Sequence, residues 1–545
     1  MQLSWTEVRR HGTLRSFMRL QRTASLAVFA ALGCFIMGPS SGCSSSSKPG
    51  ATAGGGDDSG TDDGGSNSLV QNNGDAGSSG FPTMTCATQS GGTQSGFFCE
   101  QVTCPGTDVT TTLHGTVYDP AGALPLFNVA VYVPNSPPID LADGVSCANC
   151  QSFYTDPVVS ALTDEGGNFT IKNMPVGTNI PLIVQVGKWR MVYKLSEVKG
   201  CVTNDAASLA GTKLRLPKNH TEGHIPNIAI STGALDSLEC LIRRIGLDAS
   251  EYTGNPMTSV DGPRIHIFTG GDSPAGSGGA QTNNPKSMQS YQYLWLNDMQ
   301  INQFDVVLLA CEGSPTSYLS TAAQSVLQDY TNAGGRVFAS HFQYAWFNKG
   351  PFAMGSPALA TWSPDDGTIP GKVVTVGPMG DQGSVLADVI QKLPNGMPFP
   401  EGVSLHQWLS NVQALTNDKL PIWYARHNAD LTAANTASQP WIQLDPSVTD
   451  APNAAEYFSF DTPIGTAALE QCGRVVFSDL HVSGGINAQN EPGIMPDYPG
   501  GLAFTPDGCA AHPLTAQEKA LEFMIFDLSS CLTPIGSTGK IPQPQ

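Results

Sequence analysis

The sequence predicts a multidomain chain in which an antiparallel β-sandwich is followed by an open α/β domain with a parallel sheet. In residues 108–232, apolar and polar side chains alternate between Gly- and Pro-containing turns, which is typical of short antiparallel strands. In residues 233–535, compact apolar runs alternate with helical patterns, which is typical of parallel strands joined by helices. A basic and then apolar N-terminus predicts that both domains are exported.

The charge balance narrows the range of partners. The 545 residues include 27 Lys and Arg against 46 Asp and Glu, for a net charge of −19. Nucleic acid and anionic lipid surfaces would repel such a chain, so neither is expected as the main partner. Only 13% of the residues are charged, whereas 59 are Gly and 40 are Pro, which favours turn-rich β and α/β structure over long helices.

The N-terminal segment, residues 1–43, has the pattern of an export signal. Several Arg residues precede the apolar run SLAVFAALGCFIM at 25–37, which is short for a membrane span. GPSSGCSSSS follows, and it resembles the end of a bacterial lipoprotein signal. The resemblance implies that Cys43 is lipidated and anchors the protein in a membrane, at the outer membrane or cell surface, with the periplasm as second choice. Ser40 stands where an aliphatic residue is usual, and ALGC at 31–34 competes as the cleavage point, so simple secretion is the alternative.

Residues 44–107 predict a disordered tether that ends in a Cys-containing segment. The stretch GATAGGGDDSGTDDGGSNS has almost no apolar side chains to bury, so ordering it would cost entropy without return. Its acidic cluster lacks the closing Glu and the spacing of an EF-hand loop. Residues 536–545 are expected to form a disordered tail.

The cysteines favour disulfides, because an exported protein meets an oxidising compartment. Cys86, Cys99 and Cys104 cluster where little core is available and a cross-link would help most. CANC, at 147–150, has no matching second pair, so a structural disulfide or loop clip is favoured over a redox or zinc site. Apart from Cys34 and Cys43 an odd number of cysteines remains, and Cys311, inside an apolar strand, is the candidate free thiol.

The first domain carries a set of motifs that resembles one family. Its opening reads LHGTVYDPAGALPLFNVAVYVPN, and it continues ALTDEGGNFTIKNMPVG. These stretches resemble the carboxypeptidase regulatory-like (transthyretin-like) domain, which implies a β-sandwich used mostly as a non-catalytic module. The matching residues are Gly115, Val117, Asp119, Asn128, Val129, Val131, Val133, Thr163, Asp164, Gly167, Phe169, Pro175 and Gly177. No carboxypeptidase zinc motif occurs in the chain.

NHTEGHIP, at 219–226, contains His220, Glu222 and His224, which leaves a metal site open as a hypothesis. Gly223 and Pro226 disfavour the helix that would place both imidazoles on one face. The favoured interpretation is an exposed crossing between the two domains.

The second domain shows alternating helix and strand signals. Apolar spacing from Leu235 to Ile245 predicts a helix, and strands are predicted in RIHIFTGG (264–271), FDVVLLACEG (304–313), RVFAS (336–340) and GRVVFS (473–478). Two further helices are predicted, one from the capping box TAAQ at Thr321 and one from Thr515. Ligands of such sheets lie beyond the carboxyl ends of the strands. The polar residues there are TGGD at 269–272, Glu312, His341, Gln343, Tyr344, Asp479 and His481.

This pattern resembles the class I glutamine amidotransferase-like fold, which is flavodoxin-like, and within it the ThuA-like branch, with an insertion at about 348–453. The amidotransferase nucleophile is a Cys in a tight Gly-x-Cys-x-Gly elbow after the strand that matches RVFAS. This chain has His341 there, without flanking Gly, so glutaminase activity is not expected. ThuA-like proteins also lack the Cys and often carry a His, which suits His341 and His481.

Two sets of side chains are candidates for a functional site. Glu312, His341 and His481 are the catalytic candidates, since a His/Glu/His set can bind a metal or run acid–base chemistry. Gln343, Tyr344 and Asp479 are candidates for ligand contact, and so are the insertion aromatics Trp408 and Trp423, which with Tyr424 and His427 could form a sugar platform. For His341 packing or hydrogen bonding is the leading alternative, and for the aromatics a core of the insertion is favoured. Cys311 is disfavoured as a nucleophile by its apolar surroundings.

Together these observations predict a cell-envelope protein with a non-catalytic binding or structural role, whose partner is a glycan or another envelope protein. As a whole the chain resembles a lipoprotein type of myxobacteria. The alternative is a ThuA-like hydrolase or carbohydrate-processing enzyme acting through Glu312, His341 and His481. No cofactor or metal is expected.

Overall fold

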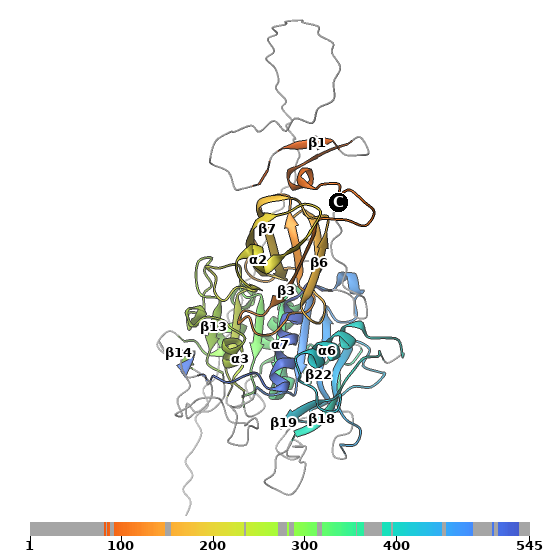
Figure 1. Ribbon diagram of the computed structural model, residues 1–545. Coiled ribbons are helices and arrows are strands. Elements are labelled where there is room, and N and C mark those ends of the chain that lie inside the picture. Colours follow the sequence, from red (N-terminus) through yellow and green to blue (C-terminus); the bar gives the residue numbers. More distant parts are fainter. Residues whose placement is uncertain are drawn as a thin grey trace, which may run out of the picture. The chain divides into compact units, whose positions relative to one another are not determined.

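A computed structural model describes most of the chain from residue 81 onward (Figure 1). The described residues are 81–82, 84–87, 92–147, 154–233, 236–270, 281–282, 288–312, 319–355, 357–363, 384–393, 396–423, 425–448, 454–482, 504–505, 509 and 511–532. They belong to one compact unit, 76–545. The predicted signal segment, Cys43, the tail, Cys150 and Tyr424 lie outside them. In the part that is described, no helix is both long and apolar enough to cross a membrane.

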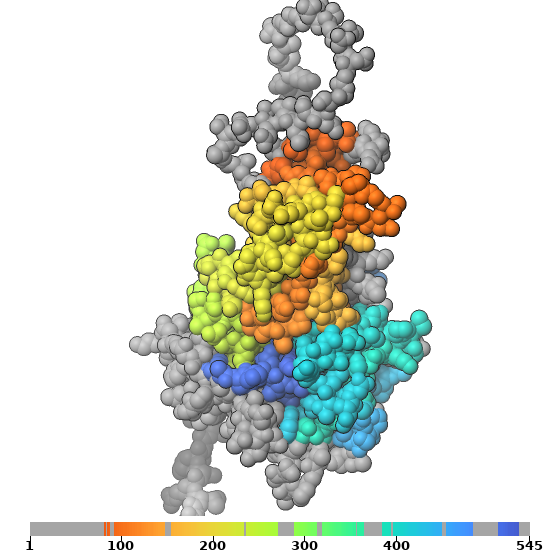
Figure 2. Space-filling view, in the orientation of Figure 1, coloured from red at the N-terminus to blue at the C-terminus, as the bar shows by residue number. Residues whose placement is uncertain are grey.

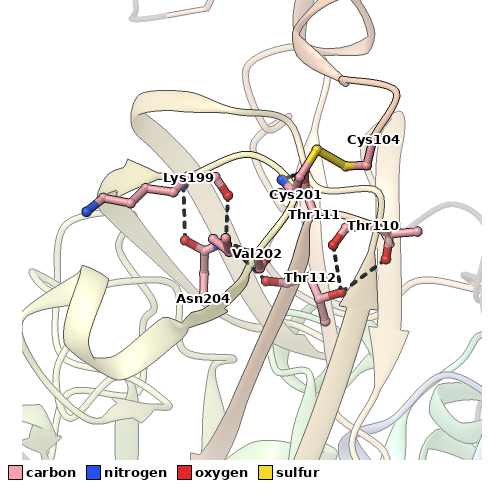
Figure 3. The surroundings of a disulfide bond; sticks show 8 residues. All are labelled: Cys104, Thr110, Thr111, Thr112, Lys199, Cys201, Val202 and Asn204. Atoms are coloured by element: carbon pink, nitrogen blue, oxygen red, sulfur yellow. Dashed lines mark hydrogen bonds between the residues drawn. A yellow bond between two sulfur atoms is a disulfide. The ribbon is translucent and has the colours of Figure 1, made fainter. Parts of the chain in front are cut away.

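Disulfides tie the first described segment to the sandwich. The hairpin of β1 (Thr85–Ala87) and β2 (Thr93–Ser95) leads into η1 (Gly96–Glu100), and Cys86 is bonded to Cys99. Cys104 is bonded to Cys201, 97 residues away (Figure 3). The amide of Cys201 donates to Thr111 Oγ1 at 2.9 Å, and Asn204 holds the same loop through its side-chain amide. The predicted cross-linking of this stretch is confirmed.

The first domain contains two four-stranded sheets. One consists of β3 (Thr112–Tyr118), β6 (Asn168–Lys172), β9 (Thr203–Asp205) and β10 (Leu214–Arg215). The other consists of β5 (Pro157–Leu162), β4 (Ala130–Pro134), β7 (Gly177–Val186) and β8 (Trp189–Val198). Alternate side chains of β3 and β4, such as Val117 and Val131, are buried in one core, as the period-two pattern predicts.

The expectation of a purely antiparallel first domain is wrong at one edge. β9 and β10 both pair with β3 in parallel, while β6 pairs with the other edge of β3 antiparallel. The chain crosses from β8 to the opposite sheet and then runs along β3, with α2 (Ala206–Ala210) between the two short strands. β9 pairs with the first half of β3 and β10 with its end, along the same edge, and both run parallel to β3.

The second domain is built on a ten-stranded sheet in the order β12-β13-β11-β15-β16-β23-β22-β21-β18-β19. The first six strands are parallel: β12 (Tyr252–Thr253), β13 (Ile265–Phe268), β11 (Ile228–Ser231), β15 (Val306–Leu309), β16 (Arg336–Ser340) and β23 (Gly473–Ser478). The last four are antiparallel: β22 (Ala455–Thr462), β21 (Ser438–Leu444), β18 (Ser384–Val389) and β19 (Leu420–Trp423).

Two corrections follow from this sheet. It is mixed rather than parallel, because residues of the predicted insertion 348–453 supply β18, β19 and β21 as a continuation of the sheet. The domain begins before the predicted boundary at 232/233, because β11 lies between β13 and β15 in its parallel half. The four residues of β11 are all buried, so they show no alternation that would mark them as part of a different sheet.

The helices of the second domain agree with most of the predicted starts and stops. They are α3 (Leu238–Arg244), α4 (Asp298–Ile301), α5 (Thr321–Asn332), α6 (Pro400–Asn411) and α7 (Ala516–Ser529). Thr515 and Glu518 form the capping box of α7. The cap of α5 is Ser320, whose hydroxyl accepts from the Ala323 amide, and not Thr321 as predicted.

Short elements complete the domain. They are the 3-10 helices η2 (Ala249–Glu251), η4 (Tyr291–Trp295), η5 (His341–Trp346) and η6 (Ala468–Glu470), and the strand pairs β14 (Gln281–Thr282) with β24 (Phe504–Thr505) and β17 (Thr361–Trp362) with β20 (Ala429–Asp430). Of these, η5 matters most for function because it begins where β16 ends.

The two domains share one apolar core around α7, which is buried along most of its length. The Phe523 ring stacks on that of Phe127 in the sandwich, with 5.9 Å between the ring centroids. It also contacts the Trp408 ring of α6, with a centroid distance of 5.4 Å. Phe526 meets Trp189 of β8 edge-on at 5.6 Å. Figure 2 shows the teal segment that contains α6 directly beneath the orange and yellow sandwich.

Disulfides also connect distant parts of the chain, one between the two domains and one within the second domain. Cys147 is bonded to Cys472, next to β23, and Cys240 of α3 is bonded to Cys509. The CANC motif therefore supplies a structural disulfide, but the partner of Cys147 lies 325 residues away rather than within the motif. Cys311 is the one cysteine among the described residues that forms no disulfide bond, as predicted.

Trp408 offers a test of the shared core. Its ring is fully buried and its Nε1 donates to Pro125 O at 2.7 Å, so Trp408→Ala removes both a large apolar surface and a bond between domains. We expect the free energy of unfolding in urea to fall by about 3–5 kcal/mol. Gln407 precedes Trp408 and is exposed, so Gln407→Ala should change the free energy of unfolding by less than about 0.5 kcal/mol. A loss below about 1 kcal/mol for Trp408→Ala would contradict the shared core.

A pair of buried carboxyl groups gives a pH-dependent contribution to stability. Asp119 of the sandwich and Glu522 of α7 are both buried and adjacent. Burial raises the pKa of Asp119 to about 6, and burial together with the Asp119 charge raises the pKa of Glu522 well above its usual value. The folded state therefore binds these protons more tightly than the unfolded state. This contribution is complete below the ordinary carboxyl pKa and is lost as the pH rises through the folded-state values.

Accordingly, the free energy of unfolding should decrease between about pH 4 and pH 7, by on the order of 3 kcal/mol from Asp119 alone. Glu522→Gln keeps a hydrogen-bond donor beside Asp119 and removes one titrating group, so its decrease should be shallower. Glu470→Gln, at an exposed carboxyl, is the matched control and should follow the wild type. Urea unfolding at several pH values gives the slope of the unfolding free energy against pH for the wild type and for each variant. Equal slopes for the wild type and Glu522→Gln would refute this account.

Candidate functional site

The three neighbouring strands β15, β16 and β23 deliver side chains to one edge of the sheet. Leu309 is paired with Ala339, and Ala339 with Phe477, so the residues that follow these strands meet at their carboxyl ends. Cys311 and His341 come two residues after their paired positions, and the chain after Phe477 brings His481 to the same place. The site is therefore fixed by strand register.

Cys311, His341 and His481 form a compact cluster. The distance from Cys311 Sγ to His341 Nδ1 is 3.2 Å, and the two imidazole centroids are 4.9 Å apart at an angle of 71°. One donor atom from each residue lies within 4.8 Å of the other two. All three side chains are buried.

His341 occupies a sharp turn between β16 and η5. Its φ is +42°, in the left-handed region that non-glycine residues rarely adopt. The turn is held by the preceding residue, since Ser340 Oγ donates to Asp236 Oδ2 at 2.5 Å, while the Val482 amide donates to Asp236 Oδ1 at 2.8 Å. An elbow-like turn is thus present without the flanking glycines, and it carries an imidazole instead of a thiol.

The environment of the cluster disfavours charge on the imidazoles. Burial, and then the positive charge of Arg426, lower the pKa of His341 well below its usual value. The pKa of His481 is also lowered well below its usual value, by burial and then by the charges of His341 and Arg426. Burial also raises the pKa of Asp236 to about 7. Both imidazoles are consequently neutral at physiological pH and each carries a nitrogen lone pair.

Glu456 and Asp479 form a second buried pair beside this edge. Their segments are joined by the Asp479 amide, which donates to Glu456 O at 2.8 Å. Burial and the Asp479 charge raise the pKa of Glu456 well above its usual value. Asp479 was predicted to contact a ligand. Its Oδ2 instead accepts from the backbone amide of Asn428 at 3.1 Å and so fixes a neighbouring loop.

The other predicted site residues have separate surroundings. Glu312 is buried beside Cys311, but its carboxylate is not part of the three-atom cluster. Gln343 donates to Ala310 O at 2.7 Å and accepts from Trp346 Nε1 at 2.9 Å, which ties η5 to the end of β15. Tyr344 is buried against Trp362, with 6.3 Å between the rings.

The insertion aromatics do not form a platform at this edge. Trp408 lies in the core, which is the alternative that the sequence favoured, and it presents no open face to a sugar. Trp423 is half-buried in β19, and its amide donates to Gln517 Oε1 at 2.9 Å. His427 binds Asp430 at 2.9 Å.

The residues of NHTEGHIP do not converge. His220 Nδ1 binds Glu251 at 2.7 Å, and Glu222 forms a two-point contact with Arg215. His224 Nδ1 binds Lys188 O at 2.6 Å. Each side chain has its own partner, so the metal hypothesis for this stretch is not supported.

A cleft with both apolar and polar lining residues lies at a different part of the sheet, where β18 and β21 separate. Their pairing ends near Val389 and Ile442, because residues 391–393 turn to bond with 397–399 instead. The resulting cleft has a volume of about 890 Å³. Amide and hydroxyl side chains dominate its polar lining, and Lys392 is the one charged residue among the described residues that line it. The polar lining residues are Gln391, Lys392, Thr432, Asn435, Thr436, Ser438, Gln439 and Gln443.

Sequence reasoning missed Cys311 as a member of the strand-end cluster, although it recognised the residue as the free thiol. The available signal was its place after an apolar run, in the same relation to β15 as His341 has to β16. Asp236, Glu456 and Arg426 were also missed, since nothing in their local patterns indicates that the fold brings them to this edge.

Comparisons with known proteins give weak results. No protein-family model matches the chain, and no curated protein matches its sequence. A ThuA-like protein from Bacteroides uniformis is 10% identical, covering 47% of this chain and 82% of that one with a TM-score of 0.23. A cohesin–X-dockerin complex from Acetivibrio cellulolyticus is 12% identical, covering 25% and 85% with a TM-score of 0.15. TM-scores this low establish neither a shared fold nor a shared function.

Proposed function

We propose that the protein is an exported, membrane-tethered binding protein of the cell envelope whose cleft between β18 and β21 holds a neutral glycan. The cleft is the observation that carries this proposal. Its amide and hydroxyl groups can donate to and accept from sugar hydroxyls, and its volume of about 890 Å³ is that of a site for several sugar units. Among the described lining residues, a ligand with many charges would find only Lys392 to pair with.

The cysteines support an extracytoplasmic setting. The disulfides indicate an oxidising environment, because such bonds rarely persist in the reducing cytosol. Export through the signal segment and a lipid anchor at Cys43 account for that environment in the proposal. The carboxypeptidase regulatory-like sandwich then serves as a non-catalytic spacer between membrane and binding domain.

A binding role suits the strand-end site as well. The elbow-like turn carries His341 rather than a nucleophile, and the cluster around it is buried. The alternative is a ThuA-like hydrolase, which the convergence of His341 and His481 at the strand ends favours. An enzyme of that kind would lose glycan hydrolysis on His341→Ala, whereas the proposed binding protein hydrolyses no glycan with or without His341.

The lipid anchor can be tested in cells. Cys43→Ser removes the thiol that would carry the lipid, so the full-length protein should move from the membrane fraction to the soluble fraction. Cys34→Ser removes the competing site and should leave the distribution unchanged. Fractionation with immunoblotting measures both, and membrane retention of Cys43→Ser with loss in Cys34→Ser would place the anchor at Cys34.

The cleft can be tested with purified protein and insoluble cell-wall sacculi. Gln391, Lys392 and Thr432 are exposed, so replacing all three with Ala should leave folding intact while removing polar contacts. We expect at least a tenfold loss of co-sedimentation, since each lost polar contact costs about 0.5–1.5 kcal/mol. Gln407→Ala, outside the cleft, is the control. Unchanged sedimentation of the triple variant would exclude this cleft, and binding only to an envelope protein would replace the glycan as ligand.

A further inference from the structure

The redox state of Cys311 sets it apart from the other cysteines of the described chain. Cys311 forms no disulfide bond, whereas the other described cysteines are all disulfide-bonded: Cys86, Cys99, Cys104, Cys147, Cys201, Cys240, Cys472, Cys509 and Cys531. Its side chain is fully buried, and its sulfur lies 3.2 Å from an imidazole nitrogen. A thiol in that position has an environment suited to a metal ligand rather than to a cross-link.

The second observation is His481. Its side chain is only 5% exposed, and neither ring nitrogen has a hydrogen-bond partner among the described residues. A buried polar nitrogen without a partner costs free energy, so native structures almost always satisfy it. The ring lies 4.9 Å from that of His341 and faces the same small space as the Cys311 sulfur.

The spacing of the three donor atoms suits a single ion. A tetrahedral or trigonal centre with metal–sulfur and metal–nitrogen bonds of ordinary length holds its donors about 3.3–4 Å apart. The Cys311 and His341 donors lie 3.2 Å apart, and all three donors lie within 4.8 Å. A small rotation of the His481 ring would therefore complete the site.

We propose that Cys311, His341 and His481 bind one Cu⁺ or Zn²⁺ ion at the carboxyl ends of β15, β16 and β23. A thiolate with two imidazoles is the donor set that soft and borderline transition metals prefer. Binding replaces the thiol proton, so one proton leaves as the sulfur–metal bond forms. With Cu⁺ the buried centre has no net charge, which favours Cu⁺ over Zn²⁺ in a site closed to solvent. This inference is independent of the glycan cleft and departs from the sequence-based expectation of no metal.

Metal binding can be measured on the exported protein purified with its disulfides intact. Competition with a chromogenic Cu⁺ chelator gives the affinity for Cu⁺, and Co²⁺, as a spectroscopic substitute for Zn²⁺, gives a thiolate-to-metal charge-transfer band if Cys311 is a ligand. We expect one ion per chain. Cys311→Ser and His481→Ala should each weaken binding by at least about 100-fold, more than the loss of a supporting residue causes.

His266→Ala is the matched control, because His266 is also buried, in β13 of the same sheet, but its Nδ1 binds Asn255 O at 2.7 Å and it lies outside the cluster. It should retain the ion. The ion should also raise the unfolding midpoint of the wild type but not of Cys311→Ser, which separates loss of the site from loss of the fold. A wild type that binds neither Cu⁺ nor Co²⁺, or a Cys311→Ser variant that binds as tightly, would overturn the proposal. Glycan sedimentation in Cys311→Ser stays unchanged if the two sites are separate.

Discussion

Burial of α7 against aromatic side chains from both domains is the interaction on which the described chain depends. Phe523 and Phe526 contact the sandwich, and the opposite side of the helix packs on the large sheet. Arg244 of α3 also binds Glu518 of α7 at 2.6 Å in a buried ion pair. Since α7 contributes to the apolar core of both domains, neither domain can complete its core until residues 516–529 are in place.

The functional edge depends on a second constraint, the parallel register of β15, β16 and β23. A shift of one residue in any of these strands would turn its terminal side chain to the other face and remove it from the cluster. Arg336 and Arg474 at the opposite ends of two of the strands are buried and bonded, Arg474 to Asp461 at 2.7 Å and Arg336 to Cys472 O at 3.2 Å. These contacts fix the strands along their length, so the edge is positioned by groups at the far end of the sheet.

Local patterns in the sequence were enough for much of the fold but not for the pairing of distant segments. The alternation in β4 and the capping box at Thr515 depend on neighbouring residues, and both predictions are confirmed. The placement of β18, β19 and β21 beside β22 depends on contacts between distant residues, which no local pattern contains. The order of strands in the sequence was enough to group His341 with His481, because both follow predicted strands. The proximity of Cys311 to His341 depends on how β15 and β16 are paired, which the sequence alone does not show.

The bond between Cys147 and Cys472 has a consequence for the response of the chain to proteases. It closes a covalent ring that contains most of the second domain. Cutting any one peptide bond within that ring leaves both fragments joined to each other, and Cys240–Cys509 retains the C-terminal part in the same way. A single proteolytic cut therefore cannot release a fragment from this region, and the cleaved chain can keep its shape.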